Sequence, residues 1–161
     1  MTLELGRPTD RRPPFKYSAL TRVGFSDTDA QGIVYYGRYL PYFDLARVEY
    51  HRHLAILRID EEHELVMRAS TVEYLAPARF DDLLEVFVRL ARFGTTSATY
   101  EFAAYRVEDE VLMVSAKQTL VLVDLDERRA QPIPQHMREI VTHFEGADLD
   151  QARSTTKTST S

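Results

Sequence analysis

The spacing of apolar side chains changes twice along the chain and so predicts the order of its elements. Residues 15–27 (FKYSALTRVGFSD) alternate between apolar and polar positions, as in a β-strand. Residues 38–54 (RYLPYFDLARVEYHRHL) instead carry a stripe at helical spacing, which consists of Tyr39, Phe43, Ala46, Tyr50 and Leu54. Proline is tolerated in the first turn of a helix, so Pro41 places the start of this helix between Gly37 and Leu40.

A two-residue period returns after the helix and predicts a run of long strands. The segments with this pattern are LVMRASTVEYLAPARF (65–80), LLEVFVRLARFG (83–94), TSATYEFAAYRVED (96–109) and EVLMVSAKQTLVLVDLD (110–126). Short turns join the last three, so we expect them to form an antiparallel meander. A short closing helix is expected over residues 134–144 (PQHMREIVTHF).

These elements predict an α+β fold with one long helix and a sheet of about five strands. Two arrangements satisfy the pattern. The sheet wraps around a buried helix, or the helix packs on one sheet face and a second subunit covers part of it. Because the strands are long and the core is modest, we expect a dimer or a larger assembly.

The chain is expected to contain one domain between two loose ends. Residues 1–14 carry several prolines among polar groups and are interpreted as a flexible lead-in. Residues 15–145 form the compact unit. Residues 146–161 end in STTKTSTS and have no large apolar side chain after Leu149, so we expect a disordered tail.

Composition excludes several classes of function. The chain has 161 residues, a formal net charge of -5 and no basic run, which argues against nucleic acid or an anionic membrane as the partner. It has no cysteine, so a thiolate metal site, a disulfide framework and a cysteine nucleophile are all excluded. No apolar run approaches the roughly 18 residues of a membrane helix, and the N-terminus lacks the apolar region of a secretory signal. We therefore expect a cytoplasmic protein.

The stretch DTDAQGIVYYGRY, residues 27–39, resembles a calcium-binding loop, but its details contradict that interpretation. A calcium loop ends in a bidentate Glu at its twelfth position, where this chain has Arg38. The fifth position is Gln31, a weak neutral ligand, and the loop is entered from a predicted strand rather than a helix. The histidines are scattered without metal-binding spacing, so no metal site is expected.

Two carboxylates just before a helix favour a different chemistry. Asp27 and Asp29 alternate, so they are expected to face opposite ways, with one bracing the loop and the other directed into a cavity. The helix that follows presents free backbone N–H groups at its start, which are able to hold a developing oxyanion. A carboxylate beside an oxyanion site and an apolar pocket is what acyl transfer to water requires.

The segment FSDTDAQGIVYYGRYLPYFDLARVEY resembles the active-site segment of the hotdog-fold acyl-CoA thioesterases, in the 4-hydroxybenzoyl-CoA thioesterase-like family. The residues that carry the resemblance are Asp27, Asp29, Gly32, Ile33, Val34, Tyr35, Tyr36 and Tyr39, followed by Ala46, Arg47 and Glu49. It extends over about residues 15–145. It implies a curled antiparallel sheet wrapped around one long helix, a homodimer or homotetramer, and a pocket at a subunit interface.

The resemblance also implies roles for individual residues. Asp29 aligns with the catalytic carboxylate, acting as nucleophile or as general base, and the backbone N–H of Tyr36 aligns with the group that polarises the thioester carbonyl. Many relatives have His at the position of Tyr36. Coenzyme A belongs to the substrate, so no separate cofactor is implied. Further substrate contacts are expected from Gly32, Ile33, Asp44, Arg92, Thr95, Thr96 and Ser97.

Several alternatives stay open at this point. Asp44 has a salt bridge to Arg47 or Arg38 as an alternative to a ligand contact, and the turn from Arg92 to Ser97 has a plain hairpin as its alternative. A thioesterase acting on acyl carrier protein and a non-catalytic acyl-CoA-binding module are the competing functions. A hotdog dehydratase is disfavoured because it needs a His general base, and none lies in the loop or in the first half of the helix.

Overall fold

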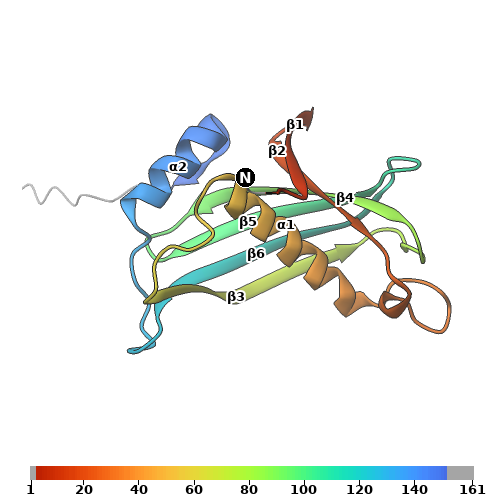
Figure 1. Ribbon diagram of the computed structural model, residues 1–161, viewed down its shortest axis with the longest axis horizontal. Helices are drawn as coiled ribbons and strands as arrows, with labels where there is room; N and C mark the ends of the chain where they lie inside the picture. The colour runs from red at the N-terminus through yellow and green to blue at the C-terminus, as the bar shows by residue number, and fades with distance from the viewer. Residues whose placement is uncertain (1–2, 152–161) are drawn as a thin grey trace, which may run out of the picture.

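The structure is a computed structural model that describes residues 3–151. Its strands are β1 (Gly6–Arg12), β2 (Phe15–Arg22), β3 (His63–Tyr74), β4 (Leu83–Phe93), β5 (Ser97–Arg106), β6 (Leu112–Asp124) and β7 (Asp150–Gln151). Its helices are α1 (Tyr39–His53) and α2 (Gln135–Glu145), with 3₁₀ turns η1 (Phe25–Asp27), η2 (Tyr36–Arg38) and η3 (Gly146–Asp148). The order agrees with the α+β class expected from the sequence (Figure 1).

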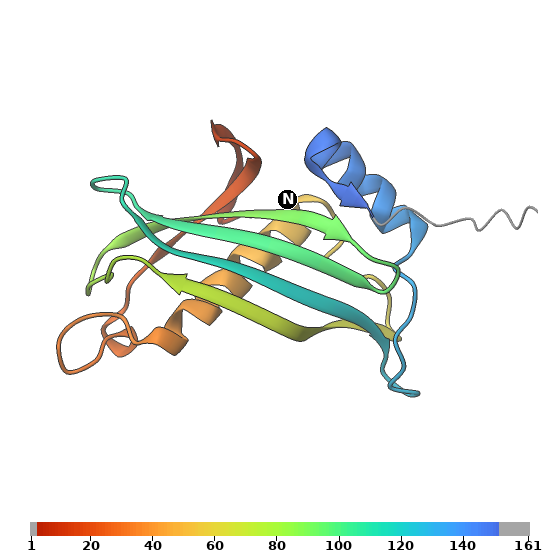
Figure 2. The same cartoon turned by 180° about the vertical axis from the view of Figure 1, so that it is seen from behind.

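All seven strands belong to one sheet, in the order β1-β2-β4-β5-β6-β3, with β7 beside β4. The pairs along this path are antiparallel, and β7 runs parallel to β4. The helix α1 lies across one face of the curved sheet and leaves the other face uncovered, as the view from behind shows (Figure 2). Within one chain α1 thus packs on one face of the curled sheet, and its coverage by a second subunit, the other part of the second expected arrangement, stays a prediction.

The expected count of about five strands is wrong, because both ends of the chain add to the sheet. The five expected strands correspond to β2 to β6, and β1 and β7 bring the total to seven. β1 lies in the segment expected to be a flexible lead-in, and it pairs antiparallel with β2. It is an edge strand, where proline and exposed polar side chains are tolerated, so its sequence carries no strand pattern.

The expected tail also begins with structure. Residues 146–151 form η3 and β7, which place this part of the chain against the end of β4. The rest of the expected tail lies outside the described residues.

The core forms between α1 and the sheet. The predicted helix begins at Tyr39, and η2 leads directly into it. Tyr39, Phe43, Ala46 and Tyr50 are buried, and they meet the alternate β4 side chains Leu84, Val86, Val88 and Leu90. The two apolar faces thus exclude water from each other, which is the main favourable term in folding.

Polar side chains also tie α1 to the sheet. Arg47 donates hydrogen bonds to Asp44 on its own helix (3.0 Å) and to Gln118 on β6 (3.0 Å). The ring of His51 contacts the hydroxyl of Tyr100 on β5. Burial, with a smaller effect of Arg47, lowers the pKa of His51 to about 3, so this imidazole is neutral near pH 7. These bonds fix the helix in position and direction over the sheet.

Candidate active site

The loop that carries Asp29 is a tight turn with glycine at the position that needs it. The Asp29 N–H donates to the Ile33 carbonyl (2.8 Å), and the Gly32 N–H donates back to the Asp29 carbonyl (3.0 Å). Thr28 and Val34 form a β-bridge that closes the turn. Gly32 has φ +76, a left-handed conformation that costs side-chain-bearing residues free energy. The Gly of the motif is therefore required by the turn itself.

The Asp29 carboxylate is held by the backbone of its own turn. Its Oδ1 accepts hydrogen bonds from the N–H of Gln31 (2.8 Å) and of Ile33 (3.4 Å). No described residue donates a hydrogen bond to Oδ2. One oxygen is thus fixed, while the other has no protein donor to compete with a water molecule or a substrate.

Asp27 braces the loop, as its alternation with Asp29 predicts. Its Oδ2 accepts hydrogen bonds from the Gly24 N–H (2.9 Å) and from the Tyr42 hydroxyl (2.7 Å). Its backbone carbonyl accepts the N–H of Tyr35 (2.9 Å). The two carboxylates of the motif therefore have separate hydrogen-bond partners.

Asp29 and Tyr36, the two residues expected to be catalytic, line the same cavity. This cavity has a volume of about 450 Å³, and its walls are Asp29, Ala30, Gln31, Ile33, Val34, Tyr35 and Tyr36. Tyr36 is the first residue of η2, which continues into α1, so its backbone N–H has no acceptor within the helix. The cavity thus combines a carboxylate with the positive end of a helical segment.

A smaller cavity of about 230 Å³ adjoins the first and is mainly apolar and aromatic. It shares Ile33, Val34 and Tyr36 with its neighbour, and Tyr39, Tyr74, Leu75, Ala76 and Pro77 complete it. The ring of Tyr74 lies 5.1 Å from that of Tyr36 and 5.8 Å from that of Tyr39, centroid to centroid. Burial raises the pKa of Tyr39, whose hydroxyl accepts the Ala78 N–H (3.3 Å). This aromatic cavity suits an acyl group next to the first cavity.

The structure does not bring Asp44 to these cavities. Its carboxylate is half-exposed and pairs with Arg47 at 3.0 Å, and it lines neither cavity. The salt bridge considered in the sequence is thus the contact that forms.

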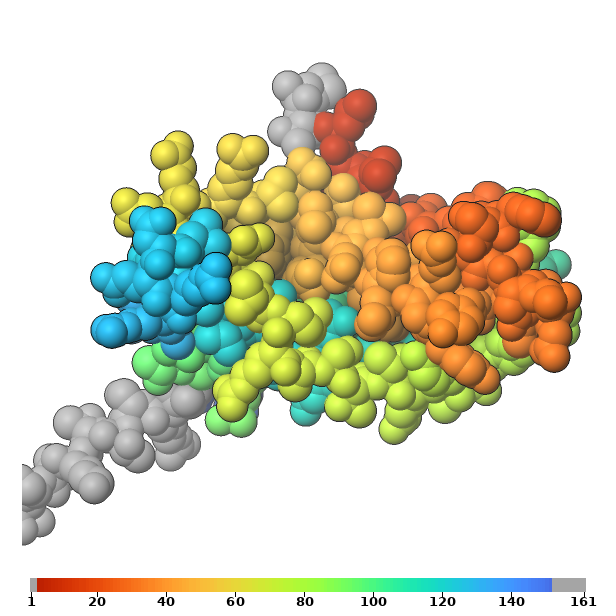
Figure 3. All heavy atoms as spheres, turned by 90° about the horizontal axis from the view of Figure 1, so that it is seen from below, coloured from red at the N-terminus to blue at the C-terminus, as the bar shows by residue number. Residues whose placement is uncertain are grey.

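The turn with Arg92, Thr95, Thr96 and Ser97 lies at the opposite end of the sheet from Asp29. The start of β4 adjoins the Asp29 loop, because Asp81 and Asp82 bond to Val23 and Arg79 pairs with Ile33. The turn follows the far end of this strand of 11 residues, roughly 30 Å away at the usual rise per residue. In Figure 3 the orange segment that contains the Asp29 loop lies at one end of the molecule, and the blue residues after β6, which bond to the turn through Ile133 and Thr95, lie at the other end.

The turn at that far end also packs against α2. The guanidinium of Arg138 on α2 donates hydrogen bonds to the carbonyls of Gly94 and Thr95. The Thr95 carbonyl also accepts the N–H of Ile133 (2.9 Å). Within one chain, these residues serve the attachment of α2 and do not contribute to the Asp29 cavity.

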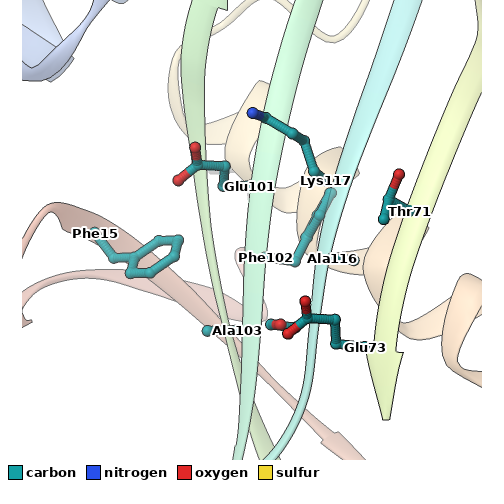
Figure 4. A pocket seen from close by; sticks show the side chains of 9 residues that line it. Phe15, Thr71, Glu73, Glu101, Phe102, Ala103, Ala116 and Lys117 are labelled. Atoms are coloured by element: carbon teal, nitrogen blue, oxygen red, sulfur yellow. The ribbon is translucent and has the colours of Figure 1, made fainter.

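Another cavity, of about 450 Å³, lies on the sheet face away from α1. Thr71, Glu73, Glu101 and Lys117 point into it from the outer surface of the strands (Figure 4). No residue expected to be functional lines it. Within residues 3–151, no three His, Cys, Asp or Glu side chains gather to hold a metal ion. Neither helix in that range has the length and apolar character that crossing a membrane requires.

With this geometry established, comparisons with known proteins agree on one family. The model of the thioesterase-like superfamily matches residues 23–141. This chain belongs to that superfamily. The match covers the Asp29 loop, α1 and the sheet from β3 to β6, and it confirms the resemblance seen in the sequence.

Individual relatives support the same assignment. The acyl-CoA thioester hydrolase YbgC of Escherichia coli is 33% identical over 126 residues, which are 76% of this chain and 91% of that protein. The acyl-CoA thioesterase YbgC of Haemophilus influenzae is 30% identical over 132 residues, 80% of this chain and 96% of the relative. A thioesterase-superfamily structure from Jannaschia has a TM-score of 0.76 at 26% identity and covers 84% of this chain and 86% of its own. The chain is therefore a thioester hydrolase with the hotdog fold.

Sequence reasoning missed the side chains that complete the site from outside the motif. Tyr74 comes from the end of β3 and reaches the carbonyl of Tyr36 with its hydroxyl (3.3 Å). Tyr42 comes from α1 and bonds to Asp27. An aromatic residue at the end of a strand gives no signal of its own. A tyrosine next to the apolar stripe of the predicted helix was a usable signal, because a buried hydroxyl needs a partner.

Proposed function

We propose that this chain hydrolyses acyl-CoA thioesters to a free acid and coenzyme A, with Asp29 as the catalytic carboxylate. The observation that carries the proposal is the shared cavity of Asp29 and Tyr36. Asp29 brings to this cavity a carboxylate with one oxygen that no described residue bonds, and Tyr36 brings a backbone N–H at the start of a helical segment. The names of the YbgC relatives support the substrate class.

The reaction needs a group that stabilises negative charge on the thioester oxygen and a group that delivers oxygen to the carbonyl carbon. The Tyr36 N–H supplies the first, because a hydrogen bond at a helix start strengthens as the oxyanion forms. Asp29 supplies the second in one of two ways. Its carboxylate attacks the carbonyl carbon, expels the thiolate and leaves a mixed anhydride that water opens, or it takes a proton from an attacking water.

Both routes end with the same atoms in the products. The C–S bond breaks, an oxygen bonded to the carbonyl carbon completes the acid, and a proton goes to the sulfur of coenzyme A. No step uses a group outside this chain, water and the substrate, so the proposed reaction has no separate cofactor. The aromatic cavity beside Asp29 would hold the acyl group, with the rings of Tyr36, Tyr39 and Tyr74 as its walls.

The edge of the sheet at β3 supports a homodimer. β3 has 12 residues and stands at the end of the strand order, so no described strand pairs with its outer edge. Val66 and Met67 are 40% and 45% exposed there. A long strand with an unpaired outer edge promotes association with another strand, and a second copy offers the same edge.

An assembly of this kind is also what would give the turn at Arg92 a role in substrate binding. Because that turn lies roughly 30 Å from Asp29 in its own chain, it serves a site only on another copy. In that position the exposed guanidinium of Arg92 would meet the phosphates of coenzyme A.

The test is release of free thiol from a panel of short-chain, long-chain and hydroxyaryl-CoA thioesters, with matched acyl carrier protein thioesters. The proposal expects saturable turnover of at least one CoA class. Turnover of acyl carrier protein thioesters alone would contradict the carrier assignment. Tight binding of acyl-CoA without thiol release from any substrate would indicate a binding module instead.

A further inference from the structure

The hydroxyl of Tyr42 reaches from the buried side of α1 to the loop that carries the catalytic carboxylate. Tyr42 is buried, and its hydroxyl donates to Asp27 Oδ2 at 2.7 Å. Burial, reinforced by the neighbouring Asp27, holds the pKa of Tyr42 well above its usual range. The hydroxyl therefore remains a donor at any pH where the protein is assayed.

Asp27 joins the segments on both sides of the Asp29 turn. Its backbone carbonyl accepts the N–H of Tyr35, the residue directly before Tyr36. Its side chain accepts the N–H of Gly24, on the strand side of the loop. The backbone hydrogen bond between Asp27 and Tyr35 thus joins the two ends of the turn. The hydrogen bond from Tyr42 to Asp27 then connects these joined ends to α1.

We propose that Tyr42 and Asp27 form a positioning pair that sets the separation between the Asp29 carboxylate and the Tyr36 N–H. This inference rests on the proposed thioesterase function and adds two residues that touch neither substrate nor reacting atoms. Asp29 stands on the turn and Tyr36 stands at the start of the helical segment. Among residues 3–151, the Tyr42–Asp27 bond is the side-chain hydrogen bond that joins α1 to the base of this turn. Without this bond, the Asp29 carboxylate and the Tyr36 N–H keep their chemistry, but the distance between them is no longer held at its proper value.

A displacement of this kind acts on the rate more than on binding. Misplacement of a catalytic group by about 1 Å costs on the order of a hundredfold in rate, while the contacts that bind the substrate are retained. Loss of one of the two hydrogen bonds at Asp27 Oδ2 is a smaller disturbance. For Tyr42→Phe we expect kcat to fall about tenfold and KM to change less than twofold.

The experiment measures kcat and KM of Tyr42→Phe, Asp27→Ala, Asp27→Asn and the double variant Tyr42→Phe/Asp27→Ala on the best CoA substrate. Tyr42→Phe and Asp27→Ala should both lower kcat, and the double variant should match Asp27→Ala, because both remove the same bond. Asp27→Asn keeps an oxygen acceptor for Tyr42 and should retain most of the kcat that Asp27→Ala loses.

Tyr100→Phe is the matched control, because it also removes a buried tyrosine hydroxyl with one side-chain partner, His51. It should lower the unfolding midpoint without changing kcat at a temperature where every variant is folded. Unchanged kcat in Tyr42→Phe, or an equal loss in Tyr100→Phe, would overturn the positioning role while leaving Asp29-dependent turnover intact. A wild type without thioesterase activity would overturn both the inference and the proposed function.

Discussion

The two ends of the sheet hold their acidic side chains in different surroundings. At one end, Asp27 and Asp29 accept hydrogen bonds from backbone N–H groups, and Asp29 lines an open cavity. At the other end, Glu145 closes α2 with no exposed surface, and neither carboxylate oxygen has a hydrogen-bond partner among the described residues. The comparison teaches that a buried acid is not by itself a sign of catalysis.

The difference lies in what each acid can reach. Asp29 lines a cavity of about 450 Å³, and no described residue donates a hydrogen bond to one of its carboxylate oxygens. Glu145 is enclosed, and the charged groups that act on its pKa are Lys16, Arg89 and Asp148. The end with α2 therefore contributes stability, and its acid should affect unfolding rather than turnover.

Ionisation of the buried Glu145 carboxyl should lower the stability of the protein as the pH rises. Burial raises the pKa of its carboxyl from 4.5 to about 7, although Lys16 and Arg89 act in the opposite direction. The folded state thus holds this proton more tightly than the unfolded state. The stabilisation that this proton contributes is fully present below pH 4.5. It is lost between pH 4.5 and 7, which lowers the free energy of unfolding by at most about 3 kcal/mol.

Urea unfolding at pH 5 and pH 8 measures this loss. Glu145→Gln cannot ionise and should flatten the pH dependence, while kcat stays unchanged. Glu139→Gln on the exposed side of α2 is the control and should follow the wild type. Parallel pH profiles for the wild type and Glu145→Gln would contradict the assignment of the proton to this residue.

Alanine substitutions at two glycines distinguish an effect of backbone strain from an effect on catalysis. Gly32 at the Asp29 end and Gly146 after α2 have φ +76 and +65, and an added Cβ would meet nothing within 4 Å at either position. Alanine at each should therefore cost about 1 kcal/mol of unfolding free energy through strain alone. Only Gly32→Ala distorts the Asp29 turn, so it alone should lower kcat, by about tenfold. Equal kcat values for the two variants would remove the distinction between the ends.

Substitution of Arg92 should have the smallest effect of these changes, and it should act on KM. Its side chain is 58% exposed and lies 3.8 Å from Asp150. One exposed charge contributes up to about 1 kcal/mol, so Arg92→Ala should raise KM for a CoA thioester by about threefold to fivefold. The same acyl group on N-acetylcysteamine lacks the phosphates and should show no change. Arg7→Ala, an exposed arginine of β1, controls for net charge, and equal effects of both variants would contradict a phosphate contact.

The sequence predicted the elements whose two faces differ. The stripe on α1 and the alternation in β2 to β6 arise because one side of each element packs against the core, and the structure confirms them. β1 escaped prediction because an edge strand with exposed side chains has no alternation to show. The burial of Glu145 escaped because a helix end with a charged residue normally faces water.

The sequence predicted those features of the site that depend on residues close together in the chain. Asp27 and Asp29 have the separate surroundings that their alternation implies, and the roles of Asp29 and Tyr36 in catalysis stay predictions. The distance from Arg92 to Asp29 depends on the direction of β4, and the Tyr42 bond joins residues that are 15 positions apart. Contacts of that kind depend on how the helix lies over the sheet, which no local pattern encodes.

The most direct test of the account compares kcat of Asp29→Asn with that of the wild type and of Asp126→Asn. Asp126 is an exposed acid beyond β6, so its variant makes the same chemical change away from the cavities. We predict that Asp29→Asn stays folded, by circular dichroism and unfolding midpoint, and loses kcat by about a hundredfold or more, while Asp126→Asn matches the wild type. A folded Asp29→Asn variant with the turnover of the wild type would contradict it.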